Sequence, residues 1–392
     1  MKMKRLPRLM LSALLAAPLG LQAATQEIHI GYLGFEPDHG PVLSNILPEP
    51  ADAGLRGAEL GINDSNTTGR FLKQHYTLHA TSTDRQDEIV QAAETLYQQG
   101  VRLFVLNLNT RQLIDVEAAL NDDVLLINAG SQDNTLRTSQ CIPGMLHTLP
   151  SRAMLTDALA QWLASRRWQR WLVIEGNQPE DRRYADSLLR SAQRMGATIV
   201  ERKAWSYDTD LRRTAQKELP PFTQTDEYDV VVVADERGDF GEYVPYNTWY
   251  PRPVVGTQGM SPVTWHRVVE AWGAAQLQSR FETLADRWMN GRDYASWAAV
   301  RSVAEAVTQT RSTDPNTLKA FILSDQFQLG AFKGRKLTFR DWSGQLRQPI
   351  PLVHPRALVS QSPQAGFLHP KTDLDTLGFD ASESQCSVKG DS

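Results

Sequence analysis

The sequence predicts an α/β protein made of two doubly wound lobes, each a parallel sheet with helices on both faces. Strand and helix patterns alternate along most of the chain, as parallel sheets require. The alternation restarts after about residue 150 with a similar order of elements. No internal repeat of roughly 20 to 50 residues is present, which excludes a solenoid. Two successive units joined near Pro150 imply a hinge with a cleft between the lobes.

The first half of the chain carries strand and helix patterns in alternation. Short apolar or alternating runs predict strands, and apolar residues at helical spacing predict helices. We expect strands at 27–34, 75–82, 101–108 and 124–131, and helices at 51–64, 85–100 and 110–123. The polar run NDSNTTG, residues 63–69, interrupts the first helix pattern. We expect it to be a turn that ends this helix, at the edge of the sheet away from the cleft.

The second half repeats the alternation and then becomes helical. Helices are expected at 152–168, 181–196, 209–222, 266–291, 293–310 and 318–325, and strands at 170–176, 197–205, 228–236, 252–259 and, as short segments, within 336–363. This pattern divides the chain as follows: first lobe 24–149 with about 262–332, second lobe 150–261 with about 333–360, and a tail at 361–392.

Residues 1–23 have the pattern of a cleaved secretory signal peptide. Four basic residues precede an apolar run, 9–21, that ends in small residues. A membrane anchor is the weaker alternative, because Pro18 and Gly20 interrupt a run shorter than the roughly 20 residues that a span needs. The sequence therefore predicts export, and we expect the periplasm as the location.

The charge of the exported chain limits its partners. Cleavage removes four basic residues and no acidic one, so the formal net charge falls from -4 to -8. An acidic chain without a basic tract is a poor candidate for binding nucleic acid or an anionic membrane. No second stretch of about 18 apolar residues follows, so we expect no membrane insertion.

The sequence has two cysteines, Cys141 and Cys386. In an oxidising compartment a lone pair of cysteines tends to form a bridge. A disulfide would fix the C-terminal tail to the middle of the chain. The alternative is two unrelated thiols.

Signatures of catalysis are absent from the sequence. It contains no H-E-x-x-H, G-x-S-x-G, P-loop or C-x-x-C motif. His75 and His79 would share one face of a strand, but about 13 Å apart, which is too far for one metal ion. We therefore expect a protein that is not an enzyme, with no metal and no catalytic cofactor.

Several segments resemble the leucine-binding-like, type I family of periplasmic solute-binding proteins of ABC transporters. GAELGINDSNTTGRFLKQHYTLHATSTD, residues 57–84, resembles a family segment in which a helix ends in Ile-Asn and a strand runs to an Asp. HTLPSRAMLTDALAQWL resembles the crossing into the second lobe, YASWAAVRSVAEAV resembles a helix that usually carries Tyr-Asp-Ala, and KLTFRDWSGQ resembles a late strand and turn. The resemblance implies Rossmann-like lobes, a hinge, an interlobe cleft and a transporter permease as partner.

Two departures from the family pattern resemble one subfamily in particular. DSNTTGRF replaces a Gly-Gly loop, and Ser296-Trp297 replaces the Tyr-Asp of the helix. Together with the ending DTLGFDASESQC, these features are similar to the subfamily associated with alcohol oxidation that depends on pyrroloquinoline quinone (PQQ). This resemblance implies that the ligand is PQQ or a small molecule of alcohol metabolism. It disfavours a simple amino acid.

The strand-end loops of both lobes should line the cleft, because ligands of doubly wound sheets bind beyond the carboxyl ends of the strands. The candidate residues of the first lobe are Tyr32, Phe35, Asn107, Asn109, Thr110, Arg111, Gly130, Ser131 and Gln132. Those of the second lobe are Arg183, Tyr184, Glu236, Arg237 and Thr257, with Trp265 and Trp297 from the later helical region. Local capping of loops is the alternative role for the Ser, Asn and Thr residues, and solvated turns are the alternative for Glu236 and Arg237.

PQQ would make particular demands on these residues. Trp265 and Trp297 could stack on its planar rings. The candidates for binding its carboxylates are Arg111, Arg137, Arg152, Arg182, Arg183 and Arg237, of which we favour Arg111, Arg183 and Arg237. The alternatives for the chain are a receptor for branched-chain amino acids or aromatic acids, a sensory ligand-binding module, and an enzyme on this scaffold.

Overall fold

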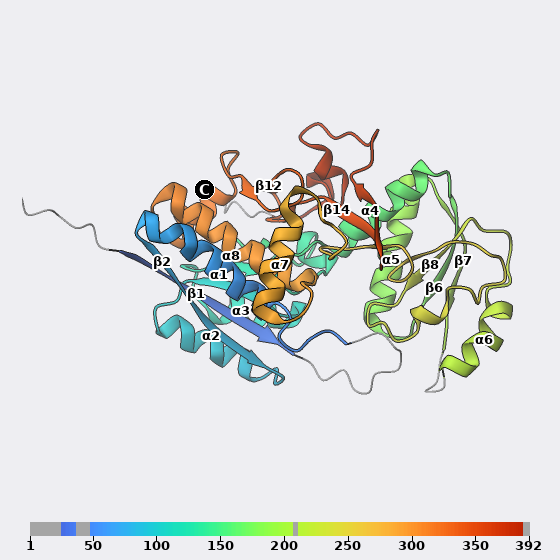
Figure 1. Ribbon diagram of the computed structural model, residues 1–392, viewed down its shortest axis with the longest axis horizontal. Coiled ribbons are helices and arrows are strands. Elements are labelled where there is room, and N and C mark those ends of the chain that lie inside the picture. Colours follow the sequence, from blue (N-terminus) through green and yellow to red (C-terminus); the bar gives the residue numbers. More distant parts are fainter. Residues whose placement is uncertain (1–24, 37–47, 207–210, 387–392) are drawn as a thin grey trace, which may run out of the picture.

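The computed structural model describes residues 25–36, 48–206 and 211–386, with the side chains of 211–213 left out. The predicted signal peptide lies outside these residues, as does most of the loop after the first strand. The molecule consists of two lobes side by side, with a group of short antiparallel strands between them (Figure 1). The predicted α/β class, with a doubly wound parallel sheet in each lobe, is confirmed.

The first lobe contains a five-stranded parallel sheet of order β2-β1-β3-β4-β5. Its strands are β1 (Gln26–Phe35), β2 (Gln74–Thr83), β3 (Leu103–Asn107), β4 (Leu125–Asn128) and β5 (Leu146–His147). The helices are α1 (Leu55–Leu72), α2 (Glu88–Gln98), α3 (Thr110–Ala119), α7 (Ala274–Ala285), α8 (Gly291–Thr310) and α9 (Pro315–Ile322). Helices α1, α7, α8 and α9 share one buried cluster with the sheet, whereas α2 and α3 share another. The sheet is therefore covered on both faces.

Helix α1 runs straight through the polar run 63–69, so the prediction of a turn there is wrong. Two side chains of the run bond back into the helix, Ser65 Oγ to Gly61 O and Thr67 Oγ1 to Asn63 O. Asn66 exchanges two hydrogen bonds with the main chain of Tyr76 in β2, at 2.9 and 2.8 Å. The polar residues thus bind the helix itself and the neighbouring strand, and the helix ends later, with Lys73 in a left-handed conformation.

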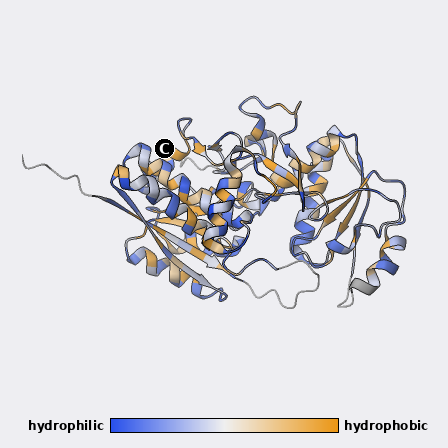
Figure 2. Cartoon of the chain, viewed as in Figure 1, coloured by the Kyte–Doolittle hydropathy of each residue, from blue (hydrophilic) through white to orange (hydrophobic). Residues whose placement is uncertain are grey.

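The second lobe contains a four-stranded parallel sheet of order β7-β6-β8-β9. Its strands are β6 (Arg170–Glu175), β7 (Thr198–Ala204), β8 (Val230–Ala234) and β9 (Val254–Gly256), and its helices are α4 (Arg152–Ser165), α5 (Pro179–Met195) and α6 (Leu211–Phe222). All five residues of β8 are buried, as expected of a central strand covered on both faces. In Figure 2 the strands of this lobe are among its most hydrophobic parts.

The chain between β9 and α8 is less helical than the sequence predicts. Only Ala274–Ala285 forms an α-helix within the predicted helix 266–291. Trp272 and Gly273 have positive φ angles of 58° and 83°, which end any helical path before α7. Asp286 is left-handed at the other end.

Short antiparallel strands follow at the boundary of the lobes. They are β10 (Ser261–Pro262), β11 (Leu329–Gly330), β12 (Lys336–Phe339), β13 (Leu346–Arg347), β14 (Ile350–His354) and β15 (Ala357–Ser362). The sheet β11-β12-β13 contributes Leu337, Phe339 and Leu346 to the first core, whereas Ile350 and Leu352 pack in the second core. The return to the second lobe therefore lies near residue 348, later than the expected boundary at 333.

Within the described residues the chain passes between the lobes three times before the tail begins. Buried residues on either side of each passage place them at 149–154, 260–265 and 346–350. Lys333 joins the second and third passages, because its buried ammonium donates to Thr264 O and Gln348 Oε1, both at 2.7 Å. These passages form the hinge region.

The predicted disulfide between Cys141 and Cys386 is present, with 5.3 Å between the two Cα atoms. It joins the end of the described chain to the loop after the short helix η1 (Asn134–Arg137) of the first lobe. Two further short helices, η4 (Asp373–Thr376) and η5 (Ala381–Glu383), lie in the same tail. The tail is therefore part of the folded structure.

Candidate functional site

Polar side chains follow the ends of β3 and β4 in the first lobe. Thr110 Oγ1 lies 2.9 Å from Ser131 Oγ and 3.2 Å from the carboxylate of Asp133, to which it donates. Because β3 and β4 are parallel neighbours, their carboxyl ends bring the two loops together. Two hydroxyl groups and one carboxylate therefore lie together at this edge of the sheet.

The side chain of Asn128 holds the loop after β4 through three hydrogen bonds. Its Oδ1 accepts from the main-chain N–H groups of Gly130 and Ser131, at 3.0 and 2.8 Å, and its Nδ2 donates to Ser131 O. A Cβ atom at Gly130 would lie 2.4 Å from Leu108 N, so only glycine fits this close approach of two loops. Because Asn128 already occupies both N–H groups, these two main-chain donors are not available to a ligand.

The facing group in the second lobe is a bidentate ion pair. Arg152 donates two hydrogen bonds of 2.7 Å to the carboxylate of Glu236. Arg152 opens α4 directly after Ser151, which caps that helix, and Glu236 follows β8. The buried Tyr184 of α5 lies close enough for the charge of Glu236 to add to burial in raising the pKa of its phenol. The second lobe thus presents a guanidinium, a carboxylate and a phenol.

The loop after β4 contacts the second lobe directly. Arg152 N donates to Gln132 O at 2.9 Å, and Ala153 N donates to Asn134 Oδ1 at 2.9 Å. Amides in the first turn of a helix have no partner within that helix. The first lobe therefore supplies the acceptors for the start of α4, and these two hydrogen bonds join the lobes beside the polar groups.

Charge complementarity accompanies this contact. Burial alone would raise the pKa of Asp133, but hydrogen bonds from Thr135 and the positive charges of Arg152 and Arg183 lower it below its ordinary value. Asp133 belongs to the first lobe, whereas both arginines belong to the second. An ionised carboxylate of one lobe thus faces the cations of the other.

A second acidic group lies deeper in the second lobe. Asp181 accepts from Glu236 N at 2.8 Å and from Gln178 N at 3.3 Å. Burial, together with the nearby charges of Asp235 and Glu236, raises the pKa of Asp181 to about 7, although the two N–H groups act in the opposite direction. Asp181 therefore holds the Glu236 loop and titrates near neutral pH.

The expectation that Trp265 and Trp297 line a cleft is wrong. Both are buried, at 4% and 1% exposure, in the core of the first lobe. Trp265 stacks on Tyr294 with ring centroids 4.8 Å apart, and the indole N–H of Trp297 donates to Asp64 at 3.0 Å. Their faces and N–H groups are already used within the lobe, so they cannot stack on a ligand in the cleft.

Other predicted residues support the loops from within. Tyr32 is buried with its hydroxyl 3.1 Å from Asn107 Nδ2, which also donates to Ala53 O. Burial raises the pKa of Tyr32. Phe35 packs against the core on the α2 side of the sheet. Tyr32 and Asn107 thus fix the loop that leads into α1.

Asn109 and Thr257 have capping roles, the alternative that the sequence left open for such residues. Asn109 forms a capping box with Gln112 at the start of α3. Thr257 Oγ1 accepts from Asp235 N at 2.9 Å and donates to Val233 O.

The three predicted arginines differ in their placement. Arg111 is 75% exposed on α3 and pairs with Asp115, so it does not join the polar group. Arg183 pairs with Glu180 in the first turn of α5, and its charge also acts on Asp133. Arg237 lies 3.6 Å from Asp239.

The structure brings together Thr110, Ser131, Gln132, Tyr184 and Glu236 of the predicted set, with Arg183 near them. The favoured set lacks Asp133, Arg152 and Asp181, although Arg152 is one of the six candidate arginines. Arg152 carried a detectable signal, since it directly follows the Ser151 cap at the predicted crossing between lobes. Asp133 lies two residues beyond Ser131 and belongs to the same strand-end loop.

Comparison with known proteins supports this architecture. A family model described as periplasmic binding protein matches residues 37–217. No curated protein matches the chain by sequence. Among solved structures, the chain is similar to a branched-chain amino acid ABC transporter periplasmic ligand-binding protein from Burkholderia xenovorans, with a TM-score of 0.73 at 13% identity. The match covers 92% of this chain and 99% of that one.

Two further structures show the same similarity. One is a periplasmic binding protein from Burkholderia mallei, with a TM-score of 0.67 at 12% identity over 93% of this chain and 99% of that one. The other is a leucine-, isoleucine-, valine-, threonine- and alanine-binding protein from Brucella ovis in a closed conformation, with a TM-score of 0.67 at 11% identity over 93% of this chain and 97% of that one. The fold is that of type I, leucine-binding-like periplasmic binding proteins.

Two kinds of feature are absent from the described residues. No helix there is long and apolar enough to cross a membrane. No group of three or more His, Cys, Asp or Glu side chains there is placed to hold a metal ion.

Proposed function

We propose that this protein is the periplasmic solute-binding component of an ABC transporter, and that its two lobes close over a small ligand. The observation that carries the proposal is the facing of two polar groups at the carboxyl ends of two parallel sheets. One group contains Thr110, Ser131 and Asp133, and the other contains Arg152 and Glu236. Hinged lobes with such a site suit ligand capture and delivery to a permease. The predicted signal peptide supports periplasmic export.

The ligand that we propose carries a carboxylate. Hydroxyl groups and a guanidinium are donors that suit a carboxylate, and charge-assisted hydrogen bonds of this kind strengthen where water is excluded. The adjacent carboxylates of Asp133 and Glu236 would in turn suit a ligand amino group. An amino acid or aromatic acid fits such a site. Similar solved structures are described as complexes with leucine, isoleucine, benzoate and 3,4-dihydroxybenzoic acid.

PQQ is the second candidate, and the sequence resemblance is what favours it. Its three carboxylates would need several cations, of which Arg152 and Arg183 are near the polar groups. Stacking on Trp265 and Trp297 is no longer an argument for PQQ, because both side chains are buried in the first core.

Calorimetric titration of the exported chain with PQQ, leucine and benzoate would separate these ligand classes. We expect the ligand that binds to lose about 30-fold in affinity in Arg152→Gln, equivalent to about 2 kcal/mol, because a charge-assisted hydrogen bond is lost. Ser131→Ala removes one hydroxyl and tests the same site with less effect on folding. Arg111→Gln is the matched control, since Arg111 is exposed on α3.

Two results would contradict the proposal. One is that none of the three compounds binds. The other is that Arg152→Gln and Ser131→Ala bind as the unaltered chain does. Incubation of the bound compound with the protein, followed by mass spectrometry, tests for turnover, and recovery of unchanged compound is expected of a binding protein.

A further inference from the structure

The C-terminal tail contacts both lobes after it leaves β15. Its first anchor is Asp375, which is fully buried. Arg340 and Arg347 donate to its carboxylate from their Nε atoms, at 2.9 and 2.8 Å. Both arginines flank the turn between β12 and β13, the hairpin that precedes the third passage between the lobes. The tail is thus held against the hinge region.

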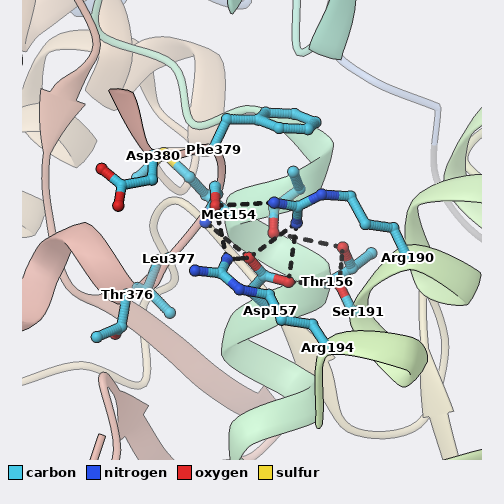
Figure 3. Close-up of polar contacts among 12 residues, drawn as sticks. Met154, Thr156, Asp157, Arg190, Ser191, Arg194, Thr376, Leu377, Phe379 and Asp380 are labelled. Atoms are coloured by element: carbon cyan, nitrogen blue, oxygen red, sulfur yellow. Dashed lines mark hydrogen bonds and ion pairs between the residues drawn. The ribbon is translucent and has the colours of Figure 1, made fainter. Parts of the chain in front are cut away.

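The second anchor lies on the second lobe and is drawn in Figure 3. Gly378 N donates to Asp157 Oδ2 at 2.8 Å, while Gly378 O accepts from Arg190 at 3.1 Å and from Arg194 at 2.7 Å. Asp157 is itself paired with both arginines. Gly378 has a φ of 84°, and a Cβ there would lie 2.8 Å from Met154 Cγ, so glycine is required. Main-chain atoms of the tail therefore complete a buried charge network between α4 and α5.

The third anchor lies on the first lobe. Ser384 Oγ donates to Arg137 O at 2.8 Å, Gln385 N donates to Thr138 O at 2.8 Å, and Cys386 is bonded to Cys141. All of these partners belong to η1 or to the loop after it. The bridge therefore adds a covalent connection between the lobes to the three passages of the described main chain.

Arg137 extends this third anchor to the candidate ligand loop. Its guanidinium donates to Ser131 O and Asp133 O, both at 3.0 Å, and to Leu149 O at 2.9 Å. A fourth hydrogen bond, of 2.9 Å, goes to Gln345 Oε1 beside the third passage. Arg137 is buried and joins three parts of the molecule. Its side chain binds the ligand loop and the hinge region, and its main-chain carbonyl accepts from the tail.

We propose that the tail is a redox-dependent strap that positions the Ser131 loop and holds it against the start of α4. The proposal rests on the proposed function in so far as it takes this loop as part of the ligand site. With the bridge closed, η1 is fixed to a tail that is anchored on the second lobe. With the bridge open, the tail stays on the second lobe through Gly378 and on the β12–β13 hairpin through Asp375. The η1 helix and the loop after it keep the two hydrogen bonds from Ser384 and Gln385.

The chemistry of opening is a thiol–disulfide exchange. A dithiol such as dithiothreitol supplies two electrons and two protons, the bond between Cys141 and Cys386 breaks to give two thiols, and the reductant closes to its own disulfide. The redox state of the compartment therefore decides whether this bond forms. The strap would be closed where disulfides persist and open where thiols are maintained.

Hydrogen exchange tests the strap without a ligand. The amides of Arg152 and Ala153 are the reporters, because their only acceptors, Gln132 O and Asn134 Oδ1, belong to the other lobe. We expect reduction of the folded protein to accelerate exchange in peptides covering 130–138 and 150–156 by about ten-fold or more. A mass increase of about two daltons, from the two added hydrogen atoms, verifies the reduction. Peptides covering β8 should be unchanged.

Variants keep the test independent of the reductant. Cys141→Ser with Cys386→Ser should reproduce the reduced pattern without dithiothreitol. Asp373→Asn is the matched control, because Asp373 lies in the same tail and its carboxylate, 40% exposed, binds Arg335 and its neighbour Thr372 instead of the bridge or η1. Equal exchange in the oxidised and reduced protein would overturn the proposal. A uniform acceleration that includes β8 would also overturn it, since the bridge would then act on global stability alone.

The two proposals can fail separately. Exchange that responds to reduction, in a protein that binds none of the three compounds, would support the strap and contradict the proposed function. If binding depends on Arg152 but hydrogen exchange is the same with and without the bridge, the result would support the proposed function and contradict the strap.

Discussion

The two lobes anchor the same tail to buried charged residues, but they surround those residues differently. In the first lobe Arg137 is enclosed by neutral oxygen atoms, three main-chain carbonyls and one side-chain amide. In the second lobe Asp157 is paired with Arg190 and Arg194, whose side chains remain 21% and 30% exposed. The first arrangement is dry, whereas the partners in the second reach water.

This difference teaches that access to water, more than the charge of the partner, sets the cost of removing a buried charged group. A buried acceptor that is left without a donor lowers the stability of the folded protein by about its desolvation penalty. An arginine that can turn to water regains most of its hydration. The anchor at Arg137, which has no ion pair, should therefore be more sensitive to substitution than the anchor at Asp157.

The largest effect is expected for Arg137→Met in the first lobe. The substitution leaves Asp133 O and Gln345 Oε1 without a donor, each at about 1 to 3 kcal/mol if it stays dry. Ser131 O and Leu149 O lose one hydrogen bond each but keep Asn128 Nδ2 and Gln345 Nε2 as donors. With partial entry of water we expect the free energy of unfolding to fall by about 4 kcal/mol. Urea unfolding followed by circular dichroism measures it, with the exposed Arg111→Met as control. A loss below about 1 kcal/mol would mean that water replaces the guanidinium freely.

A smaller effect is expected for Asp157→Asn in the second lobe. The amide keeps the size of the side chain but loses two ion pairs and an acceptor for Gly378 N. Because Arg190 and Arg194 can both turn to water, we expect a loss of about 2 kcal/mol, below the range of about 3 to 5 for a fully enclosed pair. Asp115→Asn, at the exposed pair with Arg111, is the control. A loss larger than that of Arg137→Met would reverse the comparison.

Much of the fold could be predicted from the sequence, because alternation and helical spacing report burial directly. The parallel strands and most helices follow from such patterns, and the disulfide follows from export and the number of cysteines. The passage of α1 through residues 63–69 could not be predicted. Ser65 and Thr67 bond within the helix, and Asn66 bonds to Tyr76 in a different element, so the polar run has partners that periodicity does not reveal.

The candidate site was only partly predictable for a similar reason. The rule that ligands bind beyond strand ends located the loops of Ser131 and Glu236. It could not show that Arg152 pairs with Glu236, since the two residues are 84 positions apart and meet only in the folded second lobe. The same rule could not distinguish a tryptophan that lines a cleft from a tryptophan that is buried in a core. Trp265 lies in a predicted strand-end loop and Trp297 in a predicted helix, and only their contacts with Tyr294 and Asp64 place them inside.

The smallest expected effect concerns the acidic groups of the two lobes, whose pKa values shift in opposite directions. The pKa of Asp133 is lowered, so its contribution to stability is present above its ordinary pKa and is lost as the pH falls. The pKa of Asp181 is raised to about 7. Between an ordinary pKa of about 4 and this value, the folded protein holds a proton that the unfolded chain has released. Asp181 therefore makes the free energy of unfolding fall as the pH rises.

Asp181→Asn removes this titration. Over the pH interval from about 5 to 6, one bound proton corresponds to about 1.4 kcal/mol, and we expect the variant to flatten the fall by about 1 kcal/mol. Urea unfolding at a series of pH values measures the slope. Asp186→Asn, at a more exposed carboxylate of the same helix, is the control and should keep the slope of the unaltered chain. If Asp181→Asn keeps that slope as well, the carboxyl group is ionised in the folded protein throughout the interval, and the two main-chain N–H groups outweigh its burial.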